Sequence, residues 1–361
     1  YRAIGYCMAQ DRLFQMDLIR RVTQGRLSEV VGEKALEIDH LMRALRIPDK
    51  SRLMISKTDP IVLRLTEAFC MGVNQYVDSN RDRLPLEFAI LGYEPEKWVV
   101  EHTFNVASFM AFDLSTGWTT EVMFHEILKK IGKDRLQEIL PDAAAWGQVI
   151  YPEFTGKSAQ FETGKTLLTG AGMLEQMGLT VFSGSNNWVV SGKRSVTGKP
   201  ILANDMHLGL NAPGIWYQMH QVVEGRLNVS GVVIPGQPLV TAGHTDHIAW
   251  GFTNVMVDDM DFYLEKINPN NPHEYEFNGK WRKMEVRKEK IKVKGGEFVE
   301  KEICFTHRGP IISEFKKLGD TAISMRWTGN AYSNESRTMY LLGKAKNWDD
   351  FKNAIKTFKA T

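Results

Sequence analysis

The stretch Ser183-Gly-Ser-Asn-Asn-Trp-Val-Val-Ser191 divides this sequence into two halves of different pattern. Before it, apolar residues recur mainly at the three- and four-residue spacing of amphipathic helices. After it, short runs rich in valine, isoleucine and aromatic residues are separated by Gly, Pro and Asn, as in β-sheet proteins. Strands and helices do not alternate as they do in a doubly wound fold, so the sequence predicts an α+β protein with a mainly antiparallel sheet.

The expected elements follow from these patterns. Helices are predicted over residues 1–32, 60–77, 104–114 and 119–131, with Gly32 and Gly132 as stops of the first and last. Residues 152–182 lack periodicity and are predicted to be a linker between the two halves. Strands are predicted over 188–191, 200–203, 227–234 and 247–253, a hairpin over 288–305 around Lys294-Gly-Gly, and helices over 335–345 and 348–358.

Composition excludes several classes of protein. The 361 residues suffice for about two domains or one large one. A net charge of +2, from 45 basic and 43 acidic residues, argues against a nucleic-acid partner. No apolar run approaches the roughly 18 residues of a membrane span. The three cysteines cannot all pair, and we expect buried, inert thiols.

Because the chain starts at Tyr1 without Met and stops at Thr361 after a helical pattern, we expect a fragment of a longer protein.

Common catalytic motifs are absent, and four polar stretches remain. The sequence has no G-x-S-x-G elbow, Walker A loop, HExxH or EF-hand loop. Ser183–Trp188 can be a polar turn entering a strand, and Asn204-Asp205 is typical of a turn, with His207 as a structural residue at a strand end. His244 and His247 have a spacing that suits a helical zinc site better than the turn expected here. The closely spaced carboxylates of Asp258–Asp261 either form a solvated acidic turn or bind a hard cation such as Ca²⁺.

In this order and spacing, the motifs resemble the penicillin acylase (penicillin amidase) family of N-terminal-nucleophile (Ntn) hydrolases. The similar stretches lie along nearly the whole chain: Gly5–Asp17, Gly25–Glu29, Gly184–Trp188, Asn204–Leu208, Pro235–His244 and Trp250–Asp261. The resemblance implies an Ntn-hydrolase αββα sandwich with a mostly helical N-terminal part. It also implies that residues 1–151 are the helical α-chain region, 152–184 a spacer propeptide and 185–361 the N-terminal part of the β chain.

The resemblance implies a catalytic mechanism as well. The precursor, a zymogen, would cut its own Gly184–Ser185 bond, which exposes Ser185 as an N-terminal nucleophile. The freed α-amine has a pKa near 8 in its ordinary state, and it would serve as the base for the hydroxyl. The backbone N–H of Asn254 would stabilise the oxyanion. His207 would orient groups near the α-amine, and a second oxyanion donor and an Arg would lie beyond the C-terminus. The product would be an α/β heterodimer that hydrolyses a small acyl amide through an acyl-enzyme.

The resemblance also implies a structural calcium ion, a cellular location and a biological process. The Ca²⁺ ligands would be Asp258, the carbonyl of Met260, Asp261 and Glu121. The family resemblance points to the periplasm or the cell exterior and to antibiotic biosynthetic processes.

The substrate and the class of protein stay open at this stage. Leu208 and Ala242 stand where penicillin G acylase has aromatic residues, so a wider acyl pocket, as in acyl-homoserine-lactone or cephalosporin-type acylases, is an alternative to one for penicillin G. Two further alternatives are a non-catalytic binding protein on the same fold and a calcium- or zinc-dependent hydrolase that uses His207, His244 and His247.

Overall fold

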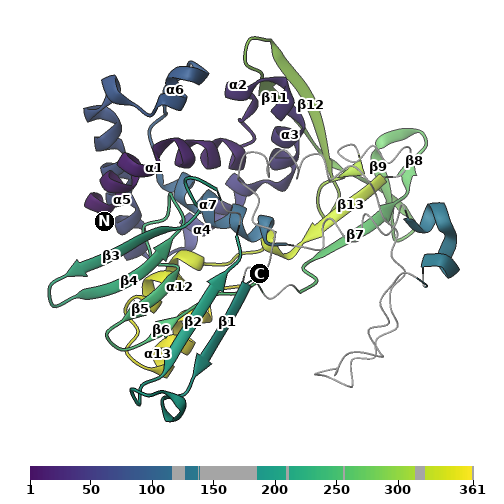
Figure 1. The fold of residues 1–361 in the computed structure, drawn as a ribbon. Coiled ribbons are helices and arrows are strands. Elements are labelled where there is room, and N and C mark those ends of the chain that lie inside the picture. Colours follow the sequence, from purple (N-terminus) through teal and green to yellow (C-terminus); the bar gives the residue numbers. More distant parts are fainter. Residues whose placement is uncertain are drawn as a thin grey trace.

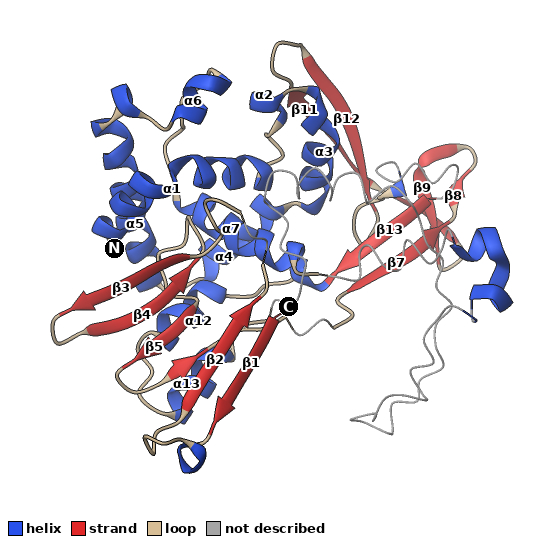
Figure 2. Ribbon diagram, in the orientation of Figure 1, coloured by secondary structure: helices blue, strands red, loops and turns tan. Residues whose placement is uncertain are grey.

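The computed structural model describes residues 1–115, 127–136, 138, 185–208, 211–254, 257–313 and 322–359. The N-terminal part is helical and the strands follow it, so the expected α+β class is confirmed (Figures 1 and 2). None of the described helices is long and apolar enough to cross a membrane.

Two long helices form the base of the helical part. Helix α1 (Arg2–Thr23) packs against α5 (Pro60–Ser79), with Tyr6 and Tyr76 edge to face at 5.4 Å between ring centroids. Gly5 and Gly72 lie where the two backbones meet, and a side chain at either position would collide with the backbone of the opposite helix. These glycines therefore permit the close crossing of the two helices.

The first predicted helix, residues 1–32, is wrong in its extent. Helix α1 ends at Thr23, Gly25 follows with a left-handed φ of 60°, and a separate short helix α2 (Ser28–Val31) precedes Gly32. Gly25 interrupts the helix because it lies against the carbonyl of Asp39, where only a glycine fits.

The remaining helices complete this part of the molecule. They are α3 (Leu36–Leu45), α4 (Ile47–Lys57), α6 (Leu86–Leu91) and α7 (Val100–Asp113). Predictions over 60–77 and 104–114 are confirmed by α5 and α7, with ends shifted by a few residues. Most of the helix predicted over 119–131 lies outside the described residues, and residues 127–136 are helical.

Strands β1 (Ser185–Val190) and β2 (Ile201–Met206) form an antiparallel pair in which Ser185 lies opposite Met206. The turn predicted at Asn204-Asp205 is wrong, because both residues are inside β2 and pair with Asn187 and Asn186. The strand-to-strand hydrogen bonds outweigh the local preference of Asn and Asp for turns.

A four-stranded antiparallel sheet lies beside this pair, in the order β3-β4-β5-β6. Its strands are β3 (Tyr217–Val223), β4 (Leu227–Val233), β5 (Ala242–Thr245) and β6 (Ala249–Trp250). The strand predicted over 227–234 is confirmed, whereas the one predicted over 247–253 shortens to two residues. Helices α12 (Glu335–Leu342) and α13 (Trp348–Ile355), both predicted, lie behind this sheet in Figure 1.

The other strands form three smaller sheets. Strand β7 (Met260–Glu265) pairs with β13 (Ala322–Trp327), and β8 (Ile267–Asn268), β9 (Asn271–Phe277) and β10 (Lys280–Lys283) form a meander. The predicted hairpin is confirmed as β11 (Glu285–Lys292) and β12 (Phe298–Phe305). It reaches back to the helices, where Arg43 pairs with Glu289 at 2.7 Å.

One core spans the helical part and the strands. Met8, Phe69, Val233, Trp250 and Met325 belong to the same buried cluster, although they come from five different elements. The cysteines only partly match the expectation of buried thiols: Cys70 is buried, which raises its pKa to about 12, but Cys304 is half-buried and Cys7 is exposed.

Candidate active site

Ser185 lies at the first position of β1 and lines a cavity of about 360 Å³. The cavity lies between α7, the β1–β2 pair, the loops around β5 and β6, and α12. Most of its walls are apolar, as at Met110, Leu114, Leu208, Ile234, Phe252 and Met339. A concave, mainly apolar space with a few polar side chains is the usual form of a small-molecule site.

Asn254, the predicted oxyanion donor, lines the same cavity as Ser185. Its side-chain Nδ2 donates to the carbonyl of Leu114 at 2.7 Å, just beyond the end of α7. Ser185 and Asn254, which are 69 positions apart in the sequence, thus line the same cavity.

The segment that carries Asn254 is tied to the start of β1 by Asn204. The Asn204 amide nitrogen donates to the carbonyls of Asn186 (3.1 Å) and Phe252 (2.8 Å), and its oxygen accepts from the Phe252 N–H at 3.0 Å. Thr253 adds a further link, because its hydroxyl donates to the Ser185 carbonyl at 3.0 Å.

Sequence reasoning missed this positioning role of Asn204. A usable indication was Gly251: its absent side chain leaves room for the Asn204 amide, which lies 2.7 Å from where a Cβ would stand.

His207 follows β2 and does not line the cavity. Its Nε2 lies 2.8 Å from Asp205 Oδ2 and 3.3 Å from Asn186 Nδ2, and the side chain is 41% exposed. In one tautomer Nε2 donates to Asp205 and in the other it accepts from Asn186, so it cannot make both bonds at once. The structure places His207 beside the residue that follows Ser185.

A buried carboxylate lines the cavity and a buried ammonium feels its charge, and the sequence analysis did not single out either of them. Glu335 opens α12, is 7% exposed and lines the cavity, and neither of its carboxylate oxygens has a hydrogen-bond partner among the described residues. Lys50 on α4 is 4% exposed, and its ammonium also lacks such a partner, lying 5.7 Å from the centre of the Trp327 ring. Burial lowers the pKa of Lys50, and the negative charge of Glu335 opposes that shift.

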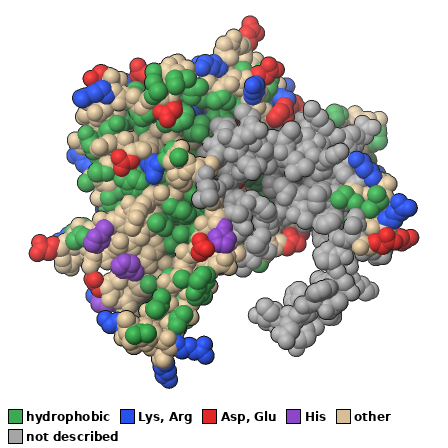
Figure 3. Space-filling model, in the orientation of Figure 1, with side chains coloured by type: hydrophobic (Ala, Val, Ile, Leu, Met, Phe, Trp, Pro, Cys, Tyr) green, Lys and Arg blue, Asp and Glu red, His purple; other side chains and the backbone are tan. Residues whose placement is uncertain are grey.

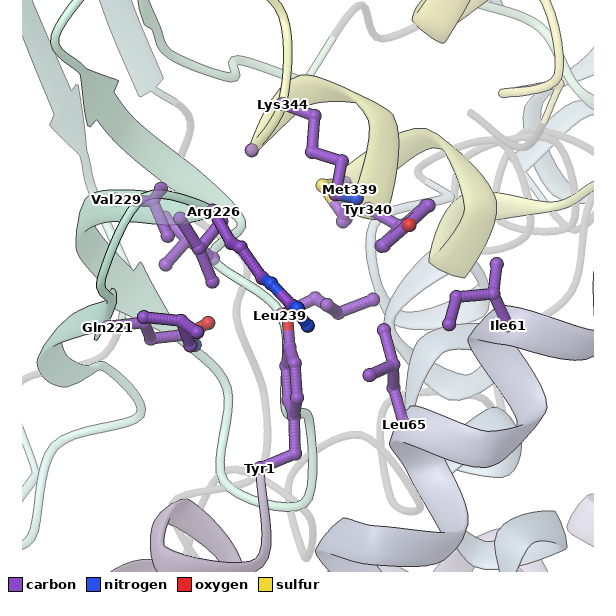
Figure 4. Close-up of a pocket in the computed structure, with 14 residues that line it drawn as sticks. Tyr1, Ile61, Leu65, Gln221, Arg226, Val229, Leu239, Met339, Tyr340 and Lys344 are labelled. Carbon is purple, nitrogen blue, oxygen red and sulfur yellow. The ribbon is translucent and has the colours of Figure 1, made fainter.

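Figure 4 shows the residues that line a second cavity, of about 150 Å³. Leu239 and Met339 line both cavities. Of the two residues expected to widen the acyl pocket, Leu208 lines the larger cavity, whereas Ala242 is buried in β5 and its neighbour Thr241 lines the cavity instead.

The acidic stretch predicted to bind calcium leads into β7. Asp258 and Asp261 are exposed and the Met260 backbone pairs with Trp327. Partial burial and the charges of Asp261 and Asp259 raise the pKa of Asp258. Closely spaced carboxylates beside a backbone carbonyl suit a hard cation such as Ca²⁺. The fourth predicted ligand, Glu121, lies outside the described residues.

The third aspartate of the stretch has a different place. Asp259 is 3% exposed, and its carboxylate accepts from the Ser115 hydroxyl at 2.5 Å and from Trp327 Nε1 at 3.1 Å. It therefore faces the protein interior and joins the end of α7 to β13.

The alternative of a metal-dependent hydrolase built on His207, His244 and His247 is not supported. His244 on β5 and His247 in the next turn are exposed, and Figure 3 shows histidines on this face of the molecule. Within the described parts of the chain, the one group of three metal-binding side chains that converge is His273, Glu302 and Cys304, on β9 and β12.

Curated relatives of this chain are acylases. It is 33% identical to the acyl-homoserine lactone acylase QuiP of Pseudomonas aeruginosa, over 86% of this chain and 37% of that protein. It is 30% identical to the penicillin acylase 2 proenzyme of a Pseudomonas species (87% and 41%) and 27% identical to the penicillin G acylase of Escherichia coli (96% and 47%). The chain thus spans less than half the length of these relatives.

Among solved structures, a thermostable penicillin G acylase from Alcaligenes faecalis is 32% identical, with a TM-score of 0.37 over 42% of this chain and 27% of that one. A family model described as penicillin amidase matches residues 1–361, the whole sequence. The chain therefore belongs to the penicillin amidase family.

Proposed function

We propose that this chain is the N-terminal part of an amidohydrolase that cleaves a linear carboxamide between an apolar acyl group and an amine, with Ser185 as the nucleophile. The observation that carries the proposal is the position of Ser185 at the wall of a 360 Å³, mainly apolar cavity. Such a cavity stabilises a bound acyl group because each methylene removed from water contributes about 0.8 kcal/mol. The similarity to acylases that act on acyl-homoserine lactones and penicillins supports the same chemistry.

Ser185 gains its base only after the chain is cut. Because Ser185 follows Gly184, its nitrogen is an amide in the precursor and cannot accept a proton. Cleavage of the Gly184–Ser185 bond turns that nitrogen into an α-amine, whose ordinary pKa near 8 suits proton transfer at neutral pH. The precursor is therefore an inactive zymogen, residues 152–184 are the spacer, and the two remaining segments, 1–151 and the one from Ser185 onward, form an α/β heterodimer.

The reaction then proceeds in two steps. The Ser185 hydroxyl attacks the substrate carbonyl while its proton passes to the α-amine, and the backbone N–H of Asn254 donates to the oxyanion. The tetrahedral intermediate formed by this attack then collapses: the proton passes from the α-amine to the leaving amine, the C–N bond breaks, and the acyl group remains as an ester on Ser185. Water repeats the attack, releases the carboxylic acid and restores the hydroxyl.

Two groups of residues support this machinery. Asn204 and Thr253 fix the Asn254 segment against β1, and His207, beside Asn186, orients the groups near the α-amine. A structural Ca²⁺ held by Asp258, the Met260 carbonyl, Asp261 and Glu121 would join the two chains, and it has no role in the chemical steps. A calcium-stabilised heterodimer suits the periplasm or the cell exterior.

The test is the mass and N-terminal sequence of the full-length protein. We expect the wild type to yield a chain that begins Ser-Asn-Asn-Trp, and Ser185→Ala to stay whole. Ser191→Ala, a matched change just after β1, should be processed like the wild type. The processed protein should then hydrolyse acyl amides. A wild type that stays whole would refute the mechanism and favour a binding protein on the same fold.

A further inference from the structure

The two cavities described above are neighbours with a common wall. Leu239 precedes β5 and is 6% exposed, and Met339 lies on α12. Both residues line the 360 Å³ cavity as well as the 150 Å³ cavity. A change in the rotamers of these two shared side chains is therefore the simplest way to connect the two spaces. Methionine is well suited to this, because its unbranched chain has three rotatable bonds.

The smaller cavity is apolar along its walls and positively charged at its edge. Leu65 on α5, Val229 on β4 and Val240 line it. Figure 4 shows Arg226 reaching in from the β3–β4 turn toward Tyr1 and Leu239, with Lys344 beyond the end of α12. Neither Arg226 nor Lys344 forms an ion pair with a carboxylate of the described residues, and both are exposed. The Lys344 ammonium lies 4.8 Å from the centre of the Tyr340 ring.

We propose that the smaller cavity is a distal subsite, which holds the far end of a long linear acyl chain whose amide carbonyl lies at Ser185. This inference rests on the function proposed above. The chain would pass between Leu239 and Met339 and bury its distal methylenes against Leu65 and Val229. A terminal carboxylate would lie beside the positive charges of Arg226 and Lys344.

The proposal assigns chain-length selection to the shared wall. For an acyl group that fits within the larger cavity, kcat/KM should not depend on the smaller cavity. A longer group gains from each methylene that leaves water, by about fourfold in kcat/KM per methylene, provided that the wall opens. Residues on either side of the wall should therefore affect long substrates more than short ones.

The experiment compares kcat/KM for a series of acyl amides of increasing length in the processed full-length enzyme. Leu239→Phe narrows the passage, and Leu65→Phe fills the smaller cavity from α5. Both should lower the ratio of long-chain to short-chain kcat/KM by about tenfold or more, as expected for two or more methylenes left in water. Leu264→Phe, the same change at an exposed position on β7, should leave the ratio at the wild-type value.

Two further measurements separate the possible outcomes. Measurable short-chain turnover shows that a variant has folded and matured, and Arg226→Gln should reduce the advantage of an ω-carboxylated chain over an alkyl chain of equal length. If the wild type hydrolyses short amides but neither Phe variant changes the ratio, the distal subsite is refuted and the proposed function stands. If the wild type hydrolyses no acyl amide of any length, the proposed function itself fails.

Discussion

The buried charges of Lys50 and Glu335 should be strongly coupled. Both side chains are more than nine-tenths buried, and neither has a hydrogen-bond partner among the described residues. The negative charge of Glu335 acts on the Lys50 ammonium and opposes the lowering of its pKa by burial. At an effective dielectric constant of about 20, two neighbouring unit charges attract by a few kcal/mol, about 4 kcal/mol at about 4 Å. Removal of one partner leaves the other charge buried and uncompensated, which typically costs about 3–5 kcal/mol.

A double-mutant cycle measures this coupling. We expect Lys50→Met and Glu335→Gln each to lower the free energy of unfolding by about 3 kcal/mol, and the double variant to lose much less than the sum. Lys57→Met, on the exposed end of the same helix, should change stability by less than about 0.5 kcal/mol.

The assay is urea unfolding at neutral pH, repeated at high salt, because buried charges are screened little by salt. A coupling below about 0.5 kcal/mol would show that the two charges do not interact, and the reasoning from their burial would be wrong. A coupling that disappears at high salt would show that water reaches the pair.

Four other outcomes are expected. Asn204→Ala should lower kcat of the processed enzyme by about 100-fold, because it releases the segment that carries the proposed oxyanion donor Asn254. The circular dichroism spectrum should change little. A variant with the kcat of the wild type would contradict this prediction. Burial lowers the pKa of His102 to about 3, so as the pH falls the unfolded chain takes up a proton at this histidine before the folded protein does. The free energy of unfolding should therefore decrease as the pH falls from about 6.5 toward about 3, and it should depend less on pH in His102→Asn. Equal pH profiles of the two proteins in urea titrations would contradict this prediction. Asp17→Asn should destabilise the protein by about 3 kcal/mol, far more than exposed Asp82→Asn, because buried Arg20 and Arg21 both lose a buried carboxylate and keep only the more exposed Glu96 and Glu29. Equal midpoints would count against this prediction. Chelation of calcium should lower the melting temperature of the wild type but not that of Asp258→Asn, and an unchanged wild type would argue against the calcium site.

Local patterns predicted the secondary structure where periodicity was regular. Helices α5, α7, α12 and α13 and the β11–β12 hairpin follow from apolar spacing and from one glycine pair. Predictions failed where a contact distant in sequence decided the outcome. Asn204 and Asp205 prefer turns in isolation, but pairing with β1 places them in a strand.

The candidate functional residues show the same division between local pattern and distant contact. Ser185, Asn254 and the acidic stretch were found because the order of their motifs resembles a family pattern, and the structure places Ser185 and Asn254 on one cavity. Glu335 and Lys50 had no such motif. Their burial depends on the packing of α4 and α12, which no local spacing reveals.

The sequence by itself determined the α+β class, most of the helices and the position of the proposed nucleophile, because hydrophobic period and short motifs are properties of neighbouring residues. Only the tertiary structure decided that Asn204 ties the Asn254 segment to β1, that Lys50 and Glu335 are buried without hydrogen-bond partners among the described residues, and that Leu239 and Met339 line two neighbouring apolar cavities. These features arise between residues that lie far apart in the chain, and their contacts are fixed by strand register and helix packing.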